Sequence, residues 1–283
     1  MEPERPRNEH ARAFDAGAAE KLSLLQGVLS TRRCQRVVDV GTGPGGVAAG
    51  IARSNPRREV IGVDRDGEML ALARRRHSQE NLRFACADAR EELPSGADLV
   101  LMSSLLHEVY SWSADGMAAV VRALRNAYRS LLPGGLLVIR DFVRPEGADT
   151  PVTMYHQRHD IREGRSLPDF VERTFWPARL TSVAVSGPAN VYATDLTSAH
   201  EFIWRKDHGG AWDYELRERY GFWSCSEASA LLFRVGFSRV HADIRANRWV
   251  LANRVARRIQ LRERASGRVV QPPVNQIVLF AER

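Results

Sequence analysis

Residues 37–46 (Val-Val-Asp-Val-Gly-Thr-Gly-Pro-Gly-Gly) constrain the fold more than any other part of this chain. A β-branched run leads into closely spaced glycines and then into the small residues 47–52, which predicts a strand, a tight turn and the start of a helix. Glycine adopts positive φ without a steric penalty and lets a ligand lie against the main-chain N–H groups of a helix N-terminus. The segment therefore predicts a ligand-binding loop.

Two glycine patterns fit this loop, and they favour different ligands. One is the G-x-G-x-x-G pattern of dinucleotide sites, formed by Gly41, Gly43 and Gly46. The other is an acidic pattern, D-x-G-x-G-x-G, formed by Asp39, Gly41, Gly43 and Gly45. A carboxylate beside the glycines would repel an anionic pyrophosphate, but it would attract a cofactor that carries sulfonium and ammonium groups. Asp39 therefore favours the second pattern.

Strands and helices alternate on both sides of the loop. A helix is expected over 14–30, after a disordered N-terminus of residues 1–13. The alternating elements that follow are strands at 36–40, 59–63, 82–86, 97–102 and 135–143, with helices near 46–54, 67–78 and 115–131. Such alternation predicts an α/β fold with a mostly parallel sheet and helices on both faces. Residues 14–143 would form the cofactor-binding core.

The alternation stops at residue 144. Residues 144–223 are either an irregular decoration or a substrate lid, and we favour the lid because it leaves from the carboxyl end of a central strand. Most of its many aromatic side chains are expected to form the segment's own core. Within it, Ser198 and Glu201 predict a capping box that opens a helix over 198–206.

Residues 224–283 are expected to complete the core. Ser224 and Glu227 predict a capping box before a helix at 228–235. Strands are expected at 238–244 and 276–281, with a basic insertion at 245–268 between them.

Three further features accompany the acidic glycine loop. The second strand ends in Asp64, the third ends in Asp88, and a Pro-Gly-Gly turn at 133–135 opens the fifth. Together the ordered set resembles the class I S-adenosylmethionine (SAM)-dependent methyltransferases, closely over about 30–143 and more loosely over 226–283. The resemblance implies a seven-stranded sheet of order 3-2-1-4-5-7-6 with strand 7 antiparallel, into which the lid is inserted.

The resemblance also implies SAM as the cofactor and assigns residues to it. Asp39 and the glycine loop would hold the methionine end, Asp64 the ribose, Asp88 the adenine, and Ser103 would lie near the transferred methyl group. The full set is Asp39, Gly41, Thr42, Gly43, Gly45, Asp64, Arg65, Asp88, Ala89 and Ser103. A structural alternative is that Asp64 or Asp66 caps the next helix and Asp88 closes a turn.

Catalytic candidates follow the fourth strand. His107 could accept a proton from the acceptor, and Glu108 or Tyr110 could orient it, although a histidine that merely packs beside the cofactor is the alternative. Possible substrate contacts are spread over three segments: Arg140, Asp141, Tyr155, His156, Arg257 and Arg258. No metal is expected, because His156 and His159 lack a supporting ligand cluster and read better as surface or lid histidines.

The net charge of +7 is concentrated in one segment. Residues 245–268 hold eight arginines against one acid, Glu263. The segment would either carry phosphate-bearing acceptors beside the active site or form a solvated helix face, because Arg254, Arg257, Arg258 and Arg262 lie near helical spacing. Three scattered cysteines, an N-terminus without an apolar stretch and the lack of an apolar run near 18 residues predict a cytoplasmic protein without a membrane partner.

These observations predict a SAM-dependent methyltransferase that acts on an oxygen or nitrogen atom of a small or medium-sized metabolite. One alternative is an RNA methyltransferase that uses the 245–268 arginines. Another is a SAM-binding protein without transfer activity. The sequence does not specify the acceptor or the oligomeric state.

Overall fold

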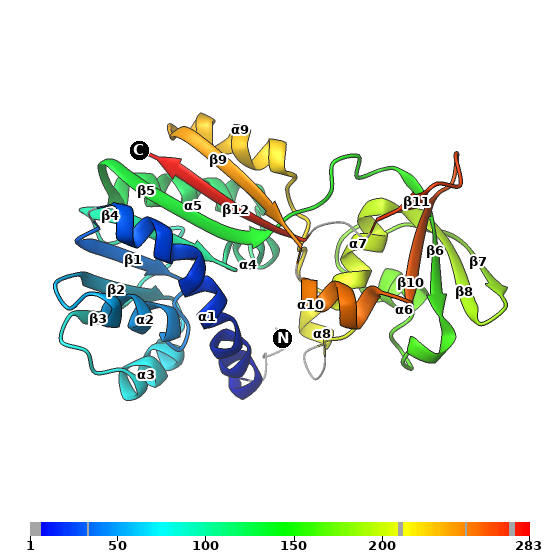
Figure 1. The fold of residues 1–283 in the computed structure, drawn as a ribbon, viewed down its shortest axis with the longest axis horizontal. Helices are drawn as coiled ribbons and strands as arrows, with labels where there is room; N and C mark the ends of the chain where they lie inside the picture. The colour runs from blue at the N-terminus through cyan, green and yellow to red at the C-terminus, as the bar shows by residue number, and fades with distance from the viewer. Residues whose placement is uncertain (1–6, 33, 209–211, 247, 272–274) are drawn as a thin grey trace. The chain divides into compact units, whose positions relative to one another are not determined.

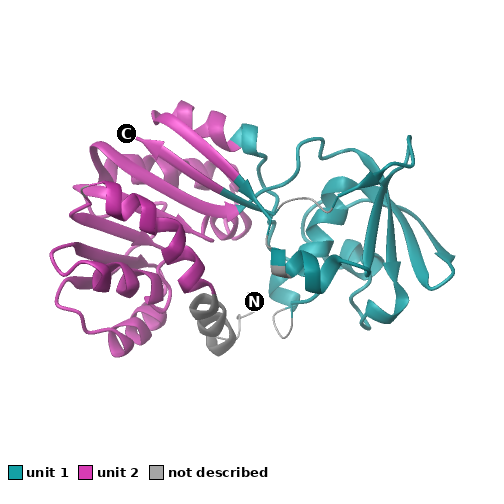
Figure 2. Cartoon of the chain, viewed as in Figure 1, with its two compact units in different colours: residues 1–3, 142–227, 244–277 teal, residues 4–141, 228–243, 278–283 magenta. Residues whose placement is uncertain are grey.

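The computed structural model describes residues 7–32, 34–208, 212–246, 248–271 and 275–283, without the side chains of residues 7–16 and 249. The chain divides into two compact units (Figure 2). Unit 1 contains residues 142–227 and 244–277. Unit 2 contains residues 4–141, 228–243 and 278–283. Each unit is described by itself.

Unit 2 is built on a seven-stranded sheet (Figure 1). The strand order is β3-β2-β1-β4-β5-β12-β9, and the pairs β1–β2, β2–β3, β1–β4 and β4–β5 are parallel. The strands are β1 (Arg36–Val40), β2 (Glu59–Asp64), β3 (Leu82–Cys86), β4 (Ala97–Ser103), β5 (Leu131–Phe142), β9 (Ser238–Arg245) and β12 (Gln276–Glu282). This order confirms the one expected from the sequence.

The last strand runs against its neighbours. Arg283, which follows β12, exchanges backbone hydrogen bonds with Gly134 and Gly135 near the start of β5. At the other end, the N–H of Val143 donates to the carbonyl of Asn275. The end of β12 therefore lies beside the beginning of β5, which makes β12 antiparallel as predicted.

Helices lie on both faces of this sheet (Figure 1). They are α1 (Arg7–Thr31), α2 (Gly46–Ser54), α3 (Gly67–Arg76), α4 (Leu106–Ser111), α5 (Met117–Ser130) and α9 (Cys225–Val235). Leu25 of α1 and Ile51 of α2 are fully buried against β1, β4 and β5. The β-branched residues of β1 are buried on both faces, as a central parallel strand requires.

The first helix differs from the expectation. α1 begins at Arg7 rather than at residue 14, so part of the stretch expected to be disordered is helical, and residues 1–6 of that stretch lie outside the described residues. The charged residues at the start of α1 show no apolar periodicity, so no helix was predicted there. Once the later part of a helix is formed and buried, however, adding residues at its N-terminus costs little free energy.

Unit 1 is built on a five-stranded sheet of order β11-β10-β6-β8-β7, whose pairs are antiparallel. The strands are β6 (Pro151–Gln157), β7 (Leu180–Ser186), β8 (Ala189–Asp195), β10 (Ile259–Glu263) and β11 (Val269–Val270). The helices are η1 (Arg158–Asp160), α6 (Leu167–Arg173), α7 (Leu196–Arg205), α8 (Trp212–Glu215), α10 (Arg248–Val250) and η2 (Leu251–Val255). The described part of the 144–223 segment therefore forms regular strands and helices rather than an irregular decoration.

The core of unit 1 lies on one face of its sheet. Burial alternates along β6, so Val152, Met154 and His156 point inward. They pack with residues of α6 and α7 and with an aromatic set made of Phe170, Trp176, Tyr192, Phe202, Trp204, Trp212 and Tyr220. Most aromatics of the segment serve its own core, as expected.

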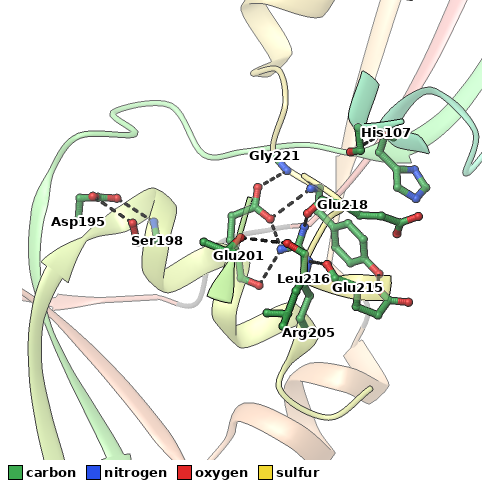
Figure 3. Close-up of polar contacts among 12 residues, drawn as sticks. His107, Asp195, Ser198, Glu201, Arg205, Glu215, Leu216, Glu218 and Gly221 are labelled. Carbon is green, nitrogen blue, oxygen red and sulfur yellow. Dashed lines mark hydrogen bonds and ion pairs between the residues drawn. The ribbon is translucent and has the colours of Figure 1, made fainter. Parts of the chain in front are cut away.

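Helix α7 begins earlier than the sequence indicated. Asp195 is its N-cap and accepts the N–H of Ser198 at 2.7 Å, so the predicted Ser198–Glu201 capping box was wrong. Glu201 instead lies buried in the helix, where it pairs with Arg205 and accepts the N–H of Gly221 at 2.6 Å (Figure 3). The second predicted box is present: Ser224 and Glu227 exchange hydrogen bonds at the start of α9.

The basic segment does not form a helix face. Of the four arginines at helical spacing, Arg254 alone lies in a helix, the π-helix η2. Arg257 follows in a left-handed turn (φ 63°), and Arg262 lies on β10. The near-helical spacing was misleading, since the segment crosses a turn into a strand. No helix of the described residues is long and apolar enough to span a membrane.

Candidate active site

The predicted glycine loop joins β1 to α2. The N–H groups of Gly41 and Thr42 donate to the carbonyl of Val63 on β2, at 2.8 and 3.0 Å, which fixes the loop above the sheet edge. Gly41 and Gly45 adopt φ of 74° and 81°, values that favour glycine. Gly45 is also the N-cap of α2 and has no side chain to bond the first turn of the helix. Backbone N–H groups at this N-terminus suit an electron-rich ligand group.

Asp39 lies beneath this loop and is buried. One of its oxygens accepts the hydroxyl of Thr42 at 2.7 Å. Burial raises the pKa of Asp39 to about 6, although the Thr42 hydrogen bond and the charge of Lys21 act in the opposite direction. A carboxylate in this position is stabilised by any cation that binds beside it.

Lys21 is a site residue that sequence reasoning missed. It is a buried lysine on α1, and burial together with the charge of Arg140 lowers its pKa, while Asp39, Asp141 and Glu108 raise it. It lies four positions before the buried Leu25. A lysine within the apolar stripe of a helix is the signal that could have identified it.

Asp64, at the end of β2, binds the glycine loop through a hydrogen bond. Its two oxygens accept the N–H of Gly43 at 2.8 Å and the N–H of Asp66 at 2.9 Å, and burial raises its pKa. Asp66 is the N-cap of α3. The helix-capping role considered for Asp64 or Asp66 therefore belongs to Asp66.

Three further residues were assigned to the cofactor, Asp88, Ala89 and Arg65, and they differ in burial and in their contacts. Asp88 forms an ion pair with Arg90 at 2.5 Å, and this hydrogen bond lowers its pKa. It also accepts the N–H of Arg90, so it closes a turn. Arg65 is exposed, whereas Ala89 is buried.

Ser103 and Ser104 end β4 at the same sheet edge. The Ser103 hydroxyl is buried and has no hydrogen-bond partner within the described part of the chain. Ser104 adopts φ of 55° and donates its N–H to the carbonyl of Arg140 at 2.7 Å. The Arg140 guanidinium contacts the Ser104 hydroxyl and pairs with Glu20 of α1 at 3.2 Å. This left-handed turn directs the chain from β4 into α4.

His107 and Asp141 form a buried pair at the start of α4. Asp141 Oδ1 lies 2.7 Å from His107 Nδ1, and Oδ2 accepts the N–H groups of Leu106 and His107 at 2.7 and 3.3 Å. The relative exposures of the two residues are 4% and 2%. The sequence gave these residues separate roles, whereas the structure brings them together.

Glu108 and Tyr110 follow His107 on α4 and are half-buried. Tyr110 packs beside Gly116. The negative charge of Glu108 acts to raise the pKa of Lys21.

The six residues predicted to contact substrate divide between the units. Arg140 and Asp141 belong to unit 2, as described. Tyr155, Arg257 and Arg258 line one cavity of unit 1. His156 is buried with its Nε2 at 3.0 Å from Asp160, so of the two positions expected, surface or lid segment, it has the second.

The residues of unit 2 fit the cofactor that the sequence resemblance implied. Ser103 has an unsatisfied buried hydroxyl, which a bound polar group would satisfy. Gly41 and Gly45 let the chain turn tightly at the start of α2, and Asp39 offers a carboxylate to a cationic ligand. Asp64 stands at the end of β2, where its carboxylate would accept hydrogen bonds from a pair of ribose hydroxyls.

Comparisons with known proteins agree with this geometry. A family described as "Methyltransferase domain" matches residues 38–139. The chain is 33% identical over 181 residues to the ubiquinone/menaquinone biosynthesis C-methyltransferase UbiE of Syntrophotalea carbinolica, over 57% of this chain and 72% of that protein. It is 36% identical over 115 residues to the demethylmenaquinone methyltransferase of Thermus thermophilus, over 39% of this chain and 49% of that protein.

A solved structure shares the fold along most of the chain. The SAM-dependent methyltransferase from Mesorhizobium loti has a TM-score of 0.55 and 20% identity, covering 95% of this chain and 100% of that one. The chain spans between 38% and 56% of the length of the curated relatives it matches first. Since the similarity to the UbiE protein covers most of that relative, this chain belongs to the class I SAM-dependent methyltransferases, and S-adenosylmethionine is its cofactor.

Proposed function

We propose that this enzyme methylates a hydroxyl oxygen of a small or medium-sized metabolite, with His107 as the general base. The buried pair of His107 and Asp141 is the observation that carries this proposal. An oxygen or nitrogen acceptor would suit the family equally. A neutral amine attacks through its own lone pair and can lose its proton later, whereas a hydroxyl becomes a strong nucleophile as its proton leaves. An oriented base therefore favours the hydroxyl.

The pair sets the protonation state of the imidazole ring. A carboxylate at Nδ1 holds the proton on that nitrogen, so the neutral ring carries its lone pair on Nε2. When Nε2 takes a proton from the acceptor, Asp141 stabilises the imidazolium that forms. The two backbone N–H groups that Asp141 accepts hold its carboxylate in this orientation.

The other residues bind, orient and exclude water. Bound SAM supplies a methyl group already activated on a sulfonium. The glycine loop and Asp64 would fix the position of the cofactor, and Asp39 would favour its cationic end. Burial of Asp39, Ser103 and His107 keeps water from competing with the acceptor.

The test is transfer of labelled methyl from SAM by wild-type protein and His107→Gln, with metabolite, RNA and protein extracts offered separately. We expect label in the metabolite fraction as an O-methyl product, and a kcat about 10²–10⁴-fold lower in the variant. The affinity for SAM should stay unchanged. A phenol acceptor that is ionised at the assay pH should recover much of the lost rate, because it needs no base.

Two results would contradict the proposal. An unchanged kcat in His107→Gln would exclude a base role, and label confined to the RNA fraction would favour RNA methylation. His159→Gln is the matched control, because His159 is an exposed histidine of unit 1. It should leave kcat and SAM affinity unaltered.

A further inference from the structure

Unit 1 contains a cavity of about 800 Å³ that the proposed chemistry at His107 does not use. It is lined by α10, η2 and β10, with contributions from β6, β11 and the β7–β8 turn. Tyr155 and Gln157 reach it from β6, on the sheet face opposite the buried Met154 and His156. Its volume lies within the range of small-molecule sites, about 300–1,000 Å³.

The lining combines an apolar wall with a cationic one. It includes the apolar residues Leu251 and Ala252 of η2, Pro188 of the β7–β8 turn and Val269 of β11. Arg248, Arg257 and Arg258 also line the cavity, and its lining residues include no aspartate or glutamate. A net positive, partly apolar wall complements an anion that carries an apolar body.

The three arginines are not equivalent. Arg258 pairs with Asp160 at 2.8 Å, and the same Asp160 carboxylate also binds Lys206 at 2.6 Å. Arg248 and Arg257 are exposed, and neither forms an ion pair or hydrogen bond with another residue of the described chain. Their guanidinium groups therefore offer donors to a carboxylate or another oxyanion.

The backbone around Arg257 supports a side-chain role. Arg257 adopts φ of 63°, a left-handed conformation that costs a non-glycine residue energy. It follows η2, a π-helix closed by the hydrogen bond from the Ala256 N–H to the Leu251 carbonyl at 2.8 Å. Glycine would take this conformation without strain, and π-helical turns occur frequently at functional sites. Arg257 therefore places a guanidinium group in the cavity lining although its backbone conformation lowers the stability of the fold.

We propose that this cavity binds a small organic anion with an apolar or aromatic body, and that Arg257 and Arg248 contact the anionic group. The apolar residues of η2, β11 and the β7–β8 turn would enclose the body of the ligand. The inference does not rest on the role proposed for His107.

The probe is 2-naphthoate, titrated calorimetrically into the full chain, with the neutral 2-naphthalenemethanol for comparison. We expect naphthoate to bind at least tenfold more tightly than the alcohol. Arg257→Gly should weaken naphthoate about tenfold while the protein stays folded, because glycine tolerates the left-handed turn. Adding Arg248→Ala should weaken it about tenfold again.

Arg239→Gly is the matched control. Arg239 is also an arginine at positive φ (48°), but it lies on β9 in unit 2 and does not line the cavity. The affinity for naphthoate should not change in this variant. His107→Gln should also bind naphthoate normally, so a failure of the proposed catalytic base would not affect this result.

A second measurement distinguishes whether the bound anion is the methyl acceptor of the enzyme or an accessory ligand that is not methylated. If the enzyme transfers labelled methyl to the bound anion, the cavity is an acceptor site; if naphthoate binds without being methylated, the cavity holds an accessory ligand, and both results support the proposal. Equal affinity of the acid and the alcohol would overturn it, as would unchanged binding in Arg257→Gly. So would binding of single-stranded RNA, steeply weakened by salt and lost in Arg257→Gly, in a protein that does not bind naphthoate.

Discussion

Each unit buries a cluster of charged side chains, and the two clusters are built differently. In unit 1, Glu201 pairs with Arg205 and accepts backbone N–H groups of Tyr220 and Gly221 (Figure 3). Arg205 in turn donates to the backbone carbonyls of Glu201, Glu215 and Glu218. In unit 2, the buried Ser103 hydroxyl has no partner among the described residues, and burial dominates the surroundings of Asp39.

The difference separates a structural role from a binding role. Burying a charge costs several kcal/mol unless the protein supplies partners. Burial raises the pKa of Glu201, but the charge of Arg205 and the hydrogen bonds outweigh it, so the pKa is lowered. The pKa of Asp39 is raised to about 6 instead. Unit 1 therefore stabilises its buried Glu201 carboxylate within the fold, whereas in unit 2 burial outweighs the contacts that stabilise the Asp39 carboxylate.

The largest expected effect comes from breaking the unit 1 cluster. Arg205→Met should lower the free energy of unfolding by about 3–5 kcal/mol, because Glu201 is left as an unpaired buried carboxylate. Denaturant unfolding measures the change. The double variant Glu201→Gln/Arg205→Met should recover part of the loss, since position 201 then carries no carboxylate that needs a cationic partner. If the double variant lost the sum of the two single losses, the pair would not act as a unit.

Replacing Asp39 in unit 2 should stabilise the protein at neutral pH, in contrast to the loss expected for Arg205→Met in unit 1. Its folded pKa of about 6 lies above the value of 3.8 expected when unfolded, so the folded state binds the proton more tightly. The stability gained from the protonated form is complete below pH 3.8 and is lost as pH rises through 6, about 3 kcal/mol in all. Asp39→Asn should therefore be more stable than wild type at pH 7, by a margin that disappears toward pH 4. Urea unfolding across this range tests it, and a margin independent of pH would show that Asp39 is not destabilised by burial.

The two units also differ in how far their sequences predicted them. In unit 2, strands and helices alternate along the chain, so local patterns placed β1, α2 and the glycine loop correctly. Asp64 was placed correctly at the end of β2 because it closes a local apolar run. The pairing of His107 with Asp141 was not found, because it joins residues 34 positions apart through the order of β4 and β5.

In unit 1, the sheet joins β10 and β11 to β6, from parts of the chain about a hundred positions apart, and no local pattern encodes that pairing. The same limit explains the helix start at Asp195. Ser198 and Glu201 fit a capping box locally, yet Glu201 is held by Gly221 and Arg205 inside the fold. The alternative that Arg257 lies on a helix face stayed open because no glycine marks the turn that follows η2.

The last prediction sharpens the comparison inside unit 2, where two neighbouring aspartates have separate tasks. Asp64→Ala should weaken SAM binding about 100-fold, because it removes both the expected ribose contact and the acceptor of the Gly43 N–H that shapes the loop. Asp66→Ala is the matched control: it removes the N-cap of α3 and should cost about 1 kcal/mol of stability, with SAM affinity nearly unchanged. Calorimetric titration with SAM measures the affinities, and thermal unfolding measures the stabilities. Equal losses of SAM affinity in the two variants would mean that Asp64 acts through the local fold rather than on the cofactor.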